Sequence, residues 1–162
     1  MATPARRGNS SPASGRVLAV ELLDRSDIEP LLGSVPDSPQ TPGATIARTR
    51  SLAIWRACGP GLTSGHQARG TDLAAVSLTV QYSARQAGRL RNGYCPRGAR
   101  PVTGLAGGGY VRTSGRVIRV RSGRGDWVVA LQLRRAAADD PLPLLAARVT
   151  HMMDLLTAAS AE

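Results

Sequence analysis

At 162 residues and 42% hydrophobic content, the chain has the length of one compact domain with its own core, which argues against several domains. Phe is absent and aromatic residues make up 3%, so the core must be built from Leu, Val, Ala and Met around Trp55 and Trp127. The formal charge of +10, with arginine as the only basic residue apart from histidine, favours anionic partners such as nucleic acid, acidic lipid surfaces or envelope polymers.

The amino-terminal residues 1–15 are rich in Pro, Ser, Ala and Arg without apolar periodicity, which predicts a disordered tail. Residues 16–158 are then expected to form a single α+β domain. The apolar run VLAVELL at 17–23 is short and contains Glu21, and no cysteine acylation site follows it. The sequence therefore predicts neither a signal peptide, nor a lipobox, nor a transmembrane helix.

A short helix is predicted after Ser26, because Ser26 and Glu29 have the spacing of a capping box. Leu31 and Leu32 provide its buried side, and Gly33 is suited to end it. The following residues 34–43 contain three prolines and are expected to form a loop.

Two strands and a second short helix are predicted in the middle of the chain. Residues 50–58 read as a strand, and residues 73–83 alternate between apolar and polar side chains as a half-buried strand does. Residues 84–91 suit a helical turn that exposes Arg85, Arg89 and Arg91.

The segment Pro101–Arg135 predicts a strand meander. Three extended segments are joined by Ser/Gly turns, and the last alternates with Trp127 and Leu131 on one face and Ala130 and Arg134 on the other. The preceding cluster Gly107-Gly108-Gly109 leads into an extended segment rather than a helix, which favours a tight turn over a phosphate-binding loop.

A carboxy-terminal amphipathic helix is predicted after Asp139-Asp140-Pro141, which combines an aspartate cap with proline in the first turn. Apolar residues follow at spacings of three and four, and their face is expected to pack on the sheet. These residues are Leu142, Leu145, Val149, Met152 and Leu156. The fold class is therefore α+β, with an antiparallel sheet flanked by helices.

Four stretches of the chain carry a family resemblance. They are LLDRSDIEPLLG at 22–33, VTGLAGGGYV at 102–111, RVIRVRSGRGDWVVALQL at 116–133 and LAARVTHMMDLL at 145–156. Together they resemble the actinobacterial LpqN-like lipoproteins. The resemblance implies a PsbP/Mog-like α/β/α sandwich and an extracytoplasmic home in the cell envelope, and it carries over no catalytic residue. The lipid-bearing cysteine and leader of that group are missing here, so a cytoplasmic location stays open.

Few residues suggest a reactive centre. Cys58 and Cys95 are either joined in a disulfide, if the compartment is oxidising, or remain two separate thiols. Two cysteines and two histidines do not make a zinc site, and no metal, cofactor or catalytic residue is predicted. His151 and Asp154 are three apart on a helix and can pair, but no nucleophile accompanies them.

A basic stripe is the main candidate for ligand binding. Four arginines of the meander would line up across neighbouring strands if the register allows it, and the larger aromatic residues would contribute apolar contact. The candidate ligand-binding residues are Arg112, Arg119, Arg121, Arg134, Trp55, Trp127 and Tyr110.

Three functions are compatible with these observations. The favoured one is a non-enzymatic envelope protein that binds an anionic or amphipathic ligand or a protein partner. An alternative is a small enzyme with an apolar substrate pocket, lined by residues such as Trp55, Tyr82, Tyr110 and Trp127. The third is a nucleic-acid-binding accessory protein, which the shortage of aromatic residues for base stacking disfavours.

Overall fold

The structure is a computed structural model that describes residues 18–33, 36–41, 50–57, 74–102, 105, 108–134 and 140–160. The predicted tail at 1–15, Cys58 and His66 lie outside these residues. Within the described part, six strands form one antiparallel sheet in the order β1-β2-β6-β5-β4-β3, accompanied by three α-helices and one 3-10 turn. The elements are η2 (Ala19–Glu21), α2 (Arg25–Leu32), β1 (Arg50–Arg56), β2 (Ala75–Tyr82), α3 (Ala84–Arg91), β3 (Ala99–Pro101), β4 (Gly109–Ser114), β5 (Val117–Arg124), β6 (Trp127–Arg134) and α4 (Leu142–Ser160).

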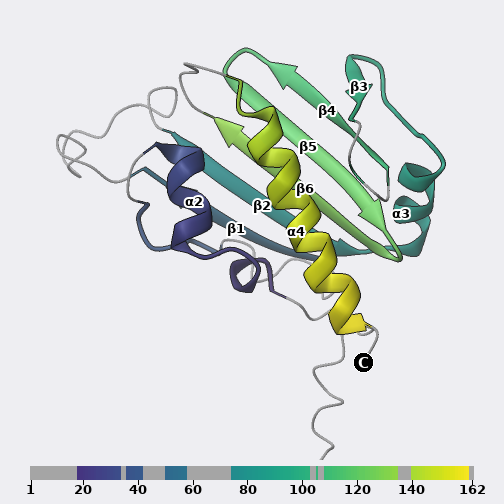
Figure 1. Cartoon of the computed structure of the whole chain (residues 1–162), viewed down its shortest axis with the longest axis horizontal. Coiled ribbons are helices and arrows are strands. Elements are labelled where there is room, and N and C mark those ends of the chain that lie inside the picture. Colours follow the sequence, from purple (N-terminus) through teal and green to yellow (C-terminus); the bar gives the residue numbers. More distant parts are fainter. Residues whose placement is uncertain are drawn as a thin grey trace, which may run out of the picture.

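The helices cover the two faces of the sheet unequally. The long helix α4 crosses β5 and β6, and α2 lies beside it over β2, so both cover one face (Figure 1). The short helix α3 packs on the opposite face, at the end of β5 and β6. The predicted α+β class with an antiparallel sheet flanked by helices is confirmed.

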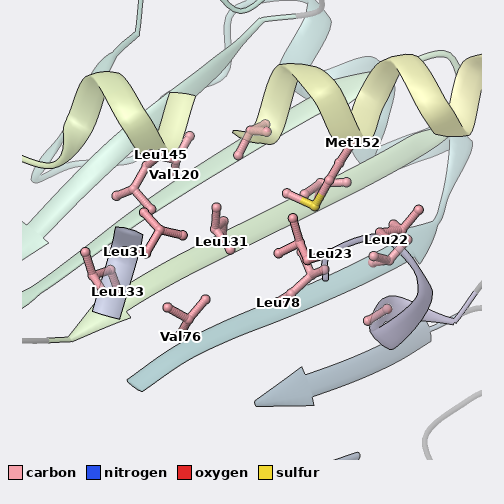
Figure 2. Close-up of a cluster of buried hydrophobic side chains, with 14 of the residues drawn as sticks. Leu22, Leu23, Leu31, Val76, Leu78, Val120, Leu131, Leu133, Leu145 and Met152 are labelled. Atoms are coloured by element: carbon pink, nitrogen blue, oxygen red, sulfur yellow. The ribbon is translucent and has the colours of Figure 1, made fainter. Parts of the chain in front are cut away.

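The main core lies between the sheet and the helices α2 and α4. Alternate residues of the central strands point into it, as the side-chain period of two requires. Figure 2 shows Val76 and Leu78 of β2 and Leu131 and Leu133 of β6 below Leu145 and Met152 of α4. Trp55 and Trp127 are also part of this core, each with 3% exposure.

A smaller cluster on the opposite face holds α3. Ala87 and Leu90 of α3 pack against Tyr110 of β4 and Val128 of β6. The predicted pattern of α3 is confirmed, because Arg85, Arg89 and Arg91 are all exposed. Since α3 is only eight residues long, it leaves the rest of this face without a helix among the described residues.

The predicted cap of α2 is wrong by two residues. Asp24 is the N-cap: its Oδ1 accepts a hydrogen bond from the Asp27 backbone N–H at 3.1 Å, and Asp27 Oδ2 accepts one from the Asp24 N–H at 3.0 Å. The Ser26 hydroxyl instead donates to Asp24 Oδ1 at 2.7 Å. These hydrogen bonds, that of Ser26 foremost, lower the pKa of Asp24. Asp24 with Asp27 and Ser26 with Glu29 both have the spacing of a capping box. The structure forms the one with two carboxylates.

The proline-rich loop is partly paired with the edge strand β1. Pro36 forms an isolated antiparallel bridge with Ala57, and Gln40 forms one with Ile54. The Gln40 bridge exchanges two backbone hydrogen bonds of 2.8 Å. Single bridges of this kind leave no alternation in the sequence, which is why the segment reads as a plain loop.

Gly108 and Gly109 lie where neighbouring elements approach closely, while Gly107 lies outside the described residues. A Cβ on Gly108, which has a φ of +87°, would lie 2.6 Å from the carbonyl oxygen of Leu90 in α3. A Cβ on Gly109 would lie 2.3 Å from the carbonyl oxygen of Arg121 in β5. Only glycine allows the chain to pass between α3 and β5 here.

The disulfide considered between Cys58 and Cys95 is not formed, and Cys95 is a free thiol. The reason lies in the sheet order. Cys58 lies outside the described residues, but Ala57 directly before it adjoins the end of β1, whereas Cys95 precedes β3, and these strands are the opposite edges of the sheet. Five strand spacings separate those edges, about 24 Å, whereas the Cα atoms of a disulfide lie within about 7 Å.

Among the described helices, none combines the length and the apolar content that a membrane crossing requires.

Candidate anion-binding site

The sheet face opposite α2 and α4 carries six arginines. Cα partners in an antiparallel ladder share a face, so the printed register assigns every strand residue to one side. Arg112 pairs with Arg119, Arg119 with Gln132, and Arg121 with Ala130, all on the side away from the main core. We call this side the arginine face; its arginines are Arg50, Arg56, Arg112, Arg119, Arg121 and Arg134.

A pocket of about 230 Å³ opens on the arginine face beside α3. Its walls come from three strands and one helix that lie far apart in the sequence, and small residues of β6 form its floor. At about 30 Å³ per water, it has room for about seven waters. The lining residues are Arg50, Thr79, Gln81, Gln86, Arg119, Arg121, Val128 and Ala130.

Arg121 is held in place by neutral acceptors. Its Nη2 donates to the side-chain oxygen of Gln86 in α3, and its Nη1 donates to the Tyr110 hydroxyl at 3.5 Å. Both partners are uncharged, so they orient the guanidinium without neutralising it. The full positive charge of Arg121 therefore remains available to a ligand.

Two cations of the pocket, Arg119 and the exposed Arg50, have no side-chain partner among the described residues. Arg119 is partly buried, and its guanidinium has no hydrogen bond or ion pair with any residue that the structure describes. Burial lowers the pKa of Arg119, and the positive charges of Arg121, Arg50 and Arg112 lower it further, against an opposing effect of Tyr110. The guanidinium remains charged at neutral pH. Because Arg119 is partly buried and surrounded by like charges, an anion bound beside it would stabilise its charged form.

Ion pairs lie on the other side of the sheet. Arg124 pairs with Asp154 of α4 at 2.8 Å, and Arg148 of α4 pairs with Asp27 of α2 at 3.4 Å. None of the described strand residues on the arginine face is acidic. The arginines of that face therefore lack the carboxylate partners that the α4 side provides.

Arginines and acidic residues are also unevenly distributed along the sequence. Residues 73–125 contain ten arginines and no acidic residue, so this stretch alone carries the +10 charge of the whole chain. The other eleven arginines are matched by the eleven acidic residues. The charged stretch forms β2, α3, β3, β4 and β5, and it supplies three arginines of the face.

The structure brings some predicted ligand-binding residues together and separates others. Arg112, Arg119, Arg121 and Arg134 share the arginine face, as the stripe requires. Tyr110 lies beside them but is buried against α3. Trp55 and Trp127 lie in the main core on the opposite side of the sheet, and Trp127 packs edge-on against Tyr82 with ring centroids 4.9 Å apart.

Sequence reasoning missed five residues that complete the site: Arg50, Arg56, Thr79, Gln81 and Gln86. The alternation in β1 places Arg50 and Arg56 opposite Ala53 and Trp55, which is a readable signal. Their proximity to the meander depends on β2 lying between β1 and β6, which no local pattern reveals.

His151 is exposed on α4, on the far side of the sheet from the arginine face. Its predicted neighbour Asp154 pairs with Arg124 instead.

The fold and the site define an α+β protein with a basic, pocket-bearing sheet face. Comparisons of this chain with protein-family models, curated proteins and solved structures found no match.

Proposed function

We propose that this protein is a non-enzymatic binding protein whose pocket holds a compact ligand with several negative charges. The observation that carries the proposal is Arg119, a partly buried cation with no partner among the described residues, beside Arg50 and Arg121. Three positive charges around one pocket favour a ligand with about three negative charges. The room for about seven waters favours a ligand larger than a single phosphate.

The roles of the arginines differ. Arg121 is oriented by Gln86 and Tyr110 and presents a fixed fork to the ligand. Arg119 gains most from binding, because the ligand replaces the water that burial has removed. Arg50 of β1 is exposed at the pocket rim and supplies the third positive charge of the pocket. Thr79 and Gln81 of β2 offer hydroxyl and amide groups to the remaining ligand oxygens.

Inorganic tripolyphosphate is a suitable probe, with binding measured by isothermal titration calorimetry. Arg119→Gln should weaken its binding at least tenfold, the ratio expected for the loss of a charge-assisted hydrogen bond of about 1.4 kcal/mol or more. Arg100→Gln is the matched control. It removes the same charge from the exposed edge strand β3, where pairing with Val111 turns it to the other side of the sheet, and it should leave binding nearly unchanged.

An equal loss of affinity in the two variants would mean that net charge and not the pocket controls binding. The absence of any tripolyphosphate binding at low ionic strength would overturn the proposed function. The apolar-pocket enzyme is the weaker alternative, because Trp55 and Trp127 pack in the core and the described pocket is lined mainly by polar side chains.

The proposed location is the cell envelope. It is supported by the resemblance of residues 22–156 to the LpqN-like lipoproteins, which also implies PsbP/Mog-like layering. In fractionated native cells, the protein should be found with the envelope. Recovery of the whole pool in the cytosol would contradict the location while leaving the anion pocket untouched.

A further inference from the structure

The pocket uses only half of the arginine face, and this inference rests on its proposed role as an anion site. Arg56, Arg112 and Arg134 lie outside the pocket on the same face. Arg112 lies directly across from Arg119 on the next strand. Arg134 pairs with Val117, two residues along β5 from Arg119. Arg56 lies in the same row as Arg134, with Ala75 of β2 between them.

The spacing of these residues gives the face its geometry. Strands lie about 4.8 Å apart and alternate residues along a strand about 6.8 Å apart, so each arginine of the face except Arg50 has another with its backbone about 5–10 Å away. Arg50 lies at the other end of β1, about 16 Å from Arg121. From β1 to β4 the face is about 20 Å wide. Arginine side chains are long enough to bring the guanidinium groups near one another across these gaps. The electrostatic fields of the six charges therefore overlap.

No acidic strand residue on the face compensates this field. Among the described residues, the side chains of Arg112 and Arg56 hydrogen-bond only to neutral oxygens, the carbonyl of Arg97 at 2.9 Å and the side chain of Gln40. The guanidinium of Arg134 has no hydrogen bond or ion pair with any described residue. A small anion in the pocket would neutralise three charges and leave the other three repelling one another. A chain with many negative charges would neutralise all six and release more counterions.

The chemistry of the face also limits the kind of chain. Single-stranded nucleic acids bind with their bases stacked on exposed aromatic side chains. The described strands offer one aromatic residue on the arginine face, Tyr110, and it is buried. The exposed Tyr94 after α3 packs edge-on against Tyr110, and the guanidinium of Arg89 covers one face of its ring, so Tyr94 offers little stacking surface. We infer that the whole arginine face binds a linear polyanion without aromatic bases, with the pocket holding one section of the chain and Arg112, Arg134 and Arg56 holding the rest.

The test compares tripolyphosphate with an inorganic polyphosphate long enough to cross the face. At one fixed ionic strength, the long chain should bind wild-type protein at least about tenfold more tightly per molecule, and its affinity should fall more steeply with added salt. Arg112→Gln/Arg134→Gln should remove most of that gain and leave tripolyphosphate affinity nearly unchanged. Arg119→Gln should weaken both ligands. The control Arg25→Gln/Arg100→Gln removes the same charge outside the face and should preserve the gain.

The outcomes separate this inference from the proposed function. If tripolyphosphate binds but the long chain binds no better, or if both double variants lose the gain equally, the extended site is overturned and the pocket stands. If neither polyphosphate binds, both are overturned. If oligo-dT of matched charge binds more tightly than the long polyphosphate, the preference for a chain without bases is wrong. Circular dichroism spectra of all variants should match that of the wild type.

Discussion

Replacing Arg119 by glutamine should make the ligand-free protein more stable. The charge of Arg119 is partly buried, is surrounded by Arg50, Arg112 and Arg121, and has no partner among the described residues. Its pKa is lower in the folded protein than in the unfolded chain, so at neutral pH the folded state pays to keep it protonated. Removing a charge held at a binding site typically stabilises by about 0.5–2 kcal/mol, and solvent screening of a partly exposed group favours the lower end.

The sign holds over the whole accessible pH range. A lowered arginine pKa costs stability wherever the group is protonated in both states, and the cost ends only in strongly alkaline solution. Urea unfolding without ligand should therefore show a higher midpoint for Arg119→Gln than for wild type at pH 6 and pH 8 alike. The difference should shrink at high salt, which screens the like charges. Tripolyphosphate should reverse the order, since it stabilises only the protein that binds it.

The matched variant Arg100→Gln should change the midpoint little, because Arg100 is exposed on the edge strand. A less stable Arg119→Gln protein would show that Arg119 has a structural role, and the proposed pocket would lose its main support.

Gly109→Ala should be the most damaging single methyl addition in the meander. The new Cβ would lie 2.3 Å from the Arg121 carbonyl oxygen and 3.0 Å from Leu105 Cδ1 and Ser122 Cα. Because the nearest atom belongs to the backbone of β5, β4 must move away from β5. Overpacking of this kind costs about 3 kcal/mol or more when it displaces backbone. The strain also falls on the strand that carries Arg119 and Arg121, so tripolyphosphate affinity should fall as well.

Gly88→Ala is the control for this substitution. Gly88 lies inside α3, where an added Cβ would meet only the end of the Arg91 side chain at an ordinary 3.7 Å. Alanine should stabilise the helix by about 0.5–1 kcal/mol. Thermal unfolding of the two variants should therefore shift in opposite directions. An unchanged melting temperature for Gly109→Ala would show that β4 and β5 are not packed as closely as described.

The elements of the fold could be predicted because their patterns are local. The alternation in β2 and the three-and-four spacing in α4 each reflect one face packed on the main core, and the alternate residues of β6 from Trp127 to Leu133 pack on the same core. The strand order could not be predicted, because β2 pairs with β6 across a long sequence separation and β1 joins the sheet only through β2. The cap of α2 was misplaced since Asp24 and Ser26 both have an acidic residue three positions later.

Part of the site could also be predicted, because some of its residues follow local patterns in the sequence. Arg119, Arg121 and Arg134 belong to the meander, so local turns fix their common face. Arg50 reaches them only through the pairing of β1 with β2. The sequence allows Trp55 and Trp127 both a place in the core and a role in ligand binding, and the structure buries both in the core.

The separation of charge between the two sides of the sheet also bears on how the protein meets a partner. The arginine face carries six arginines and no described acidic strand residue, while the described acidic residues of η2, α2 and α4 lie on the other side. A molecule with this dipole turns in the field of an anionic target before contact, so collisions become productive over a wider range of starting orientations. The association rate should consequently depend on ionic strength more strongly than the dissociation rate does.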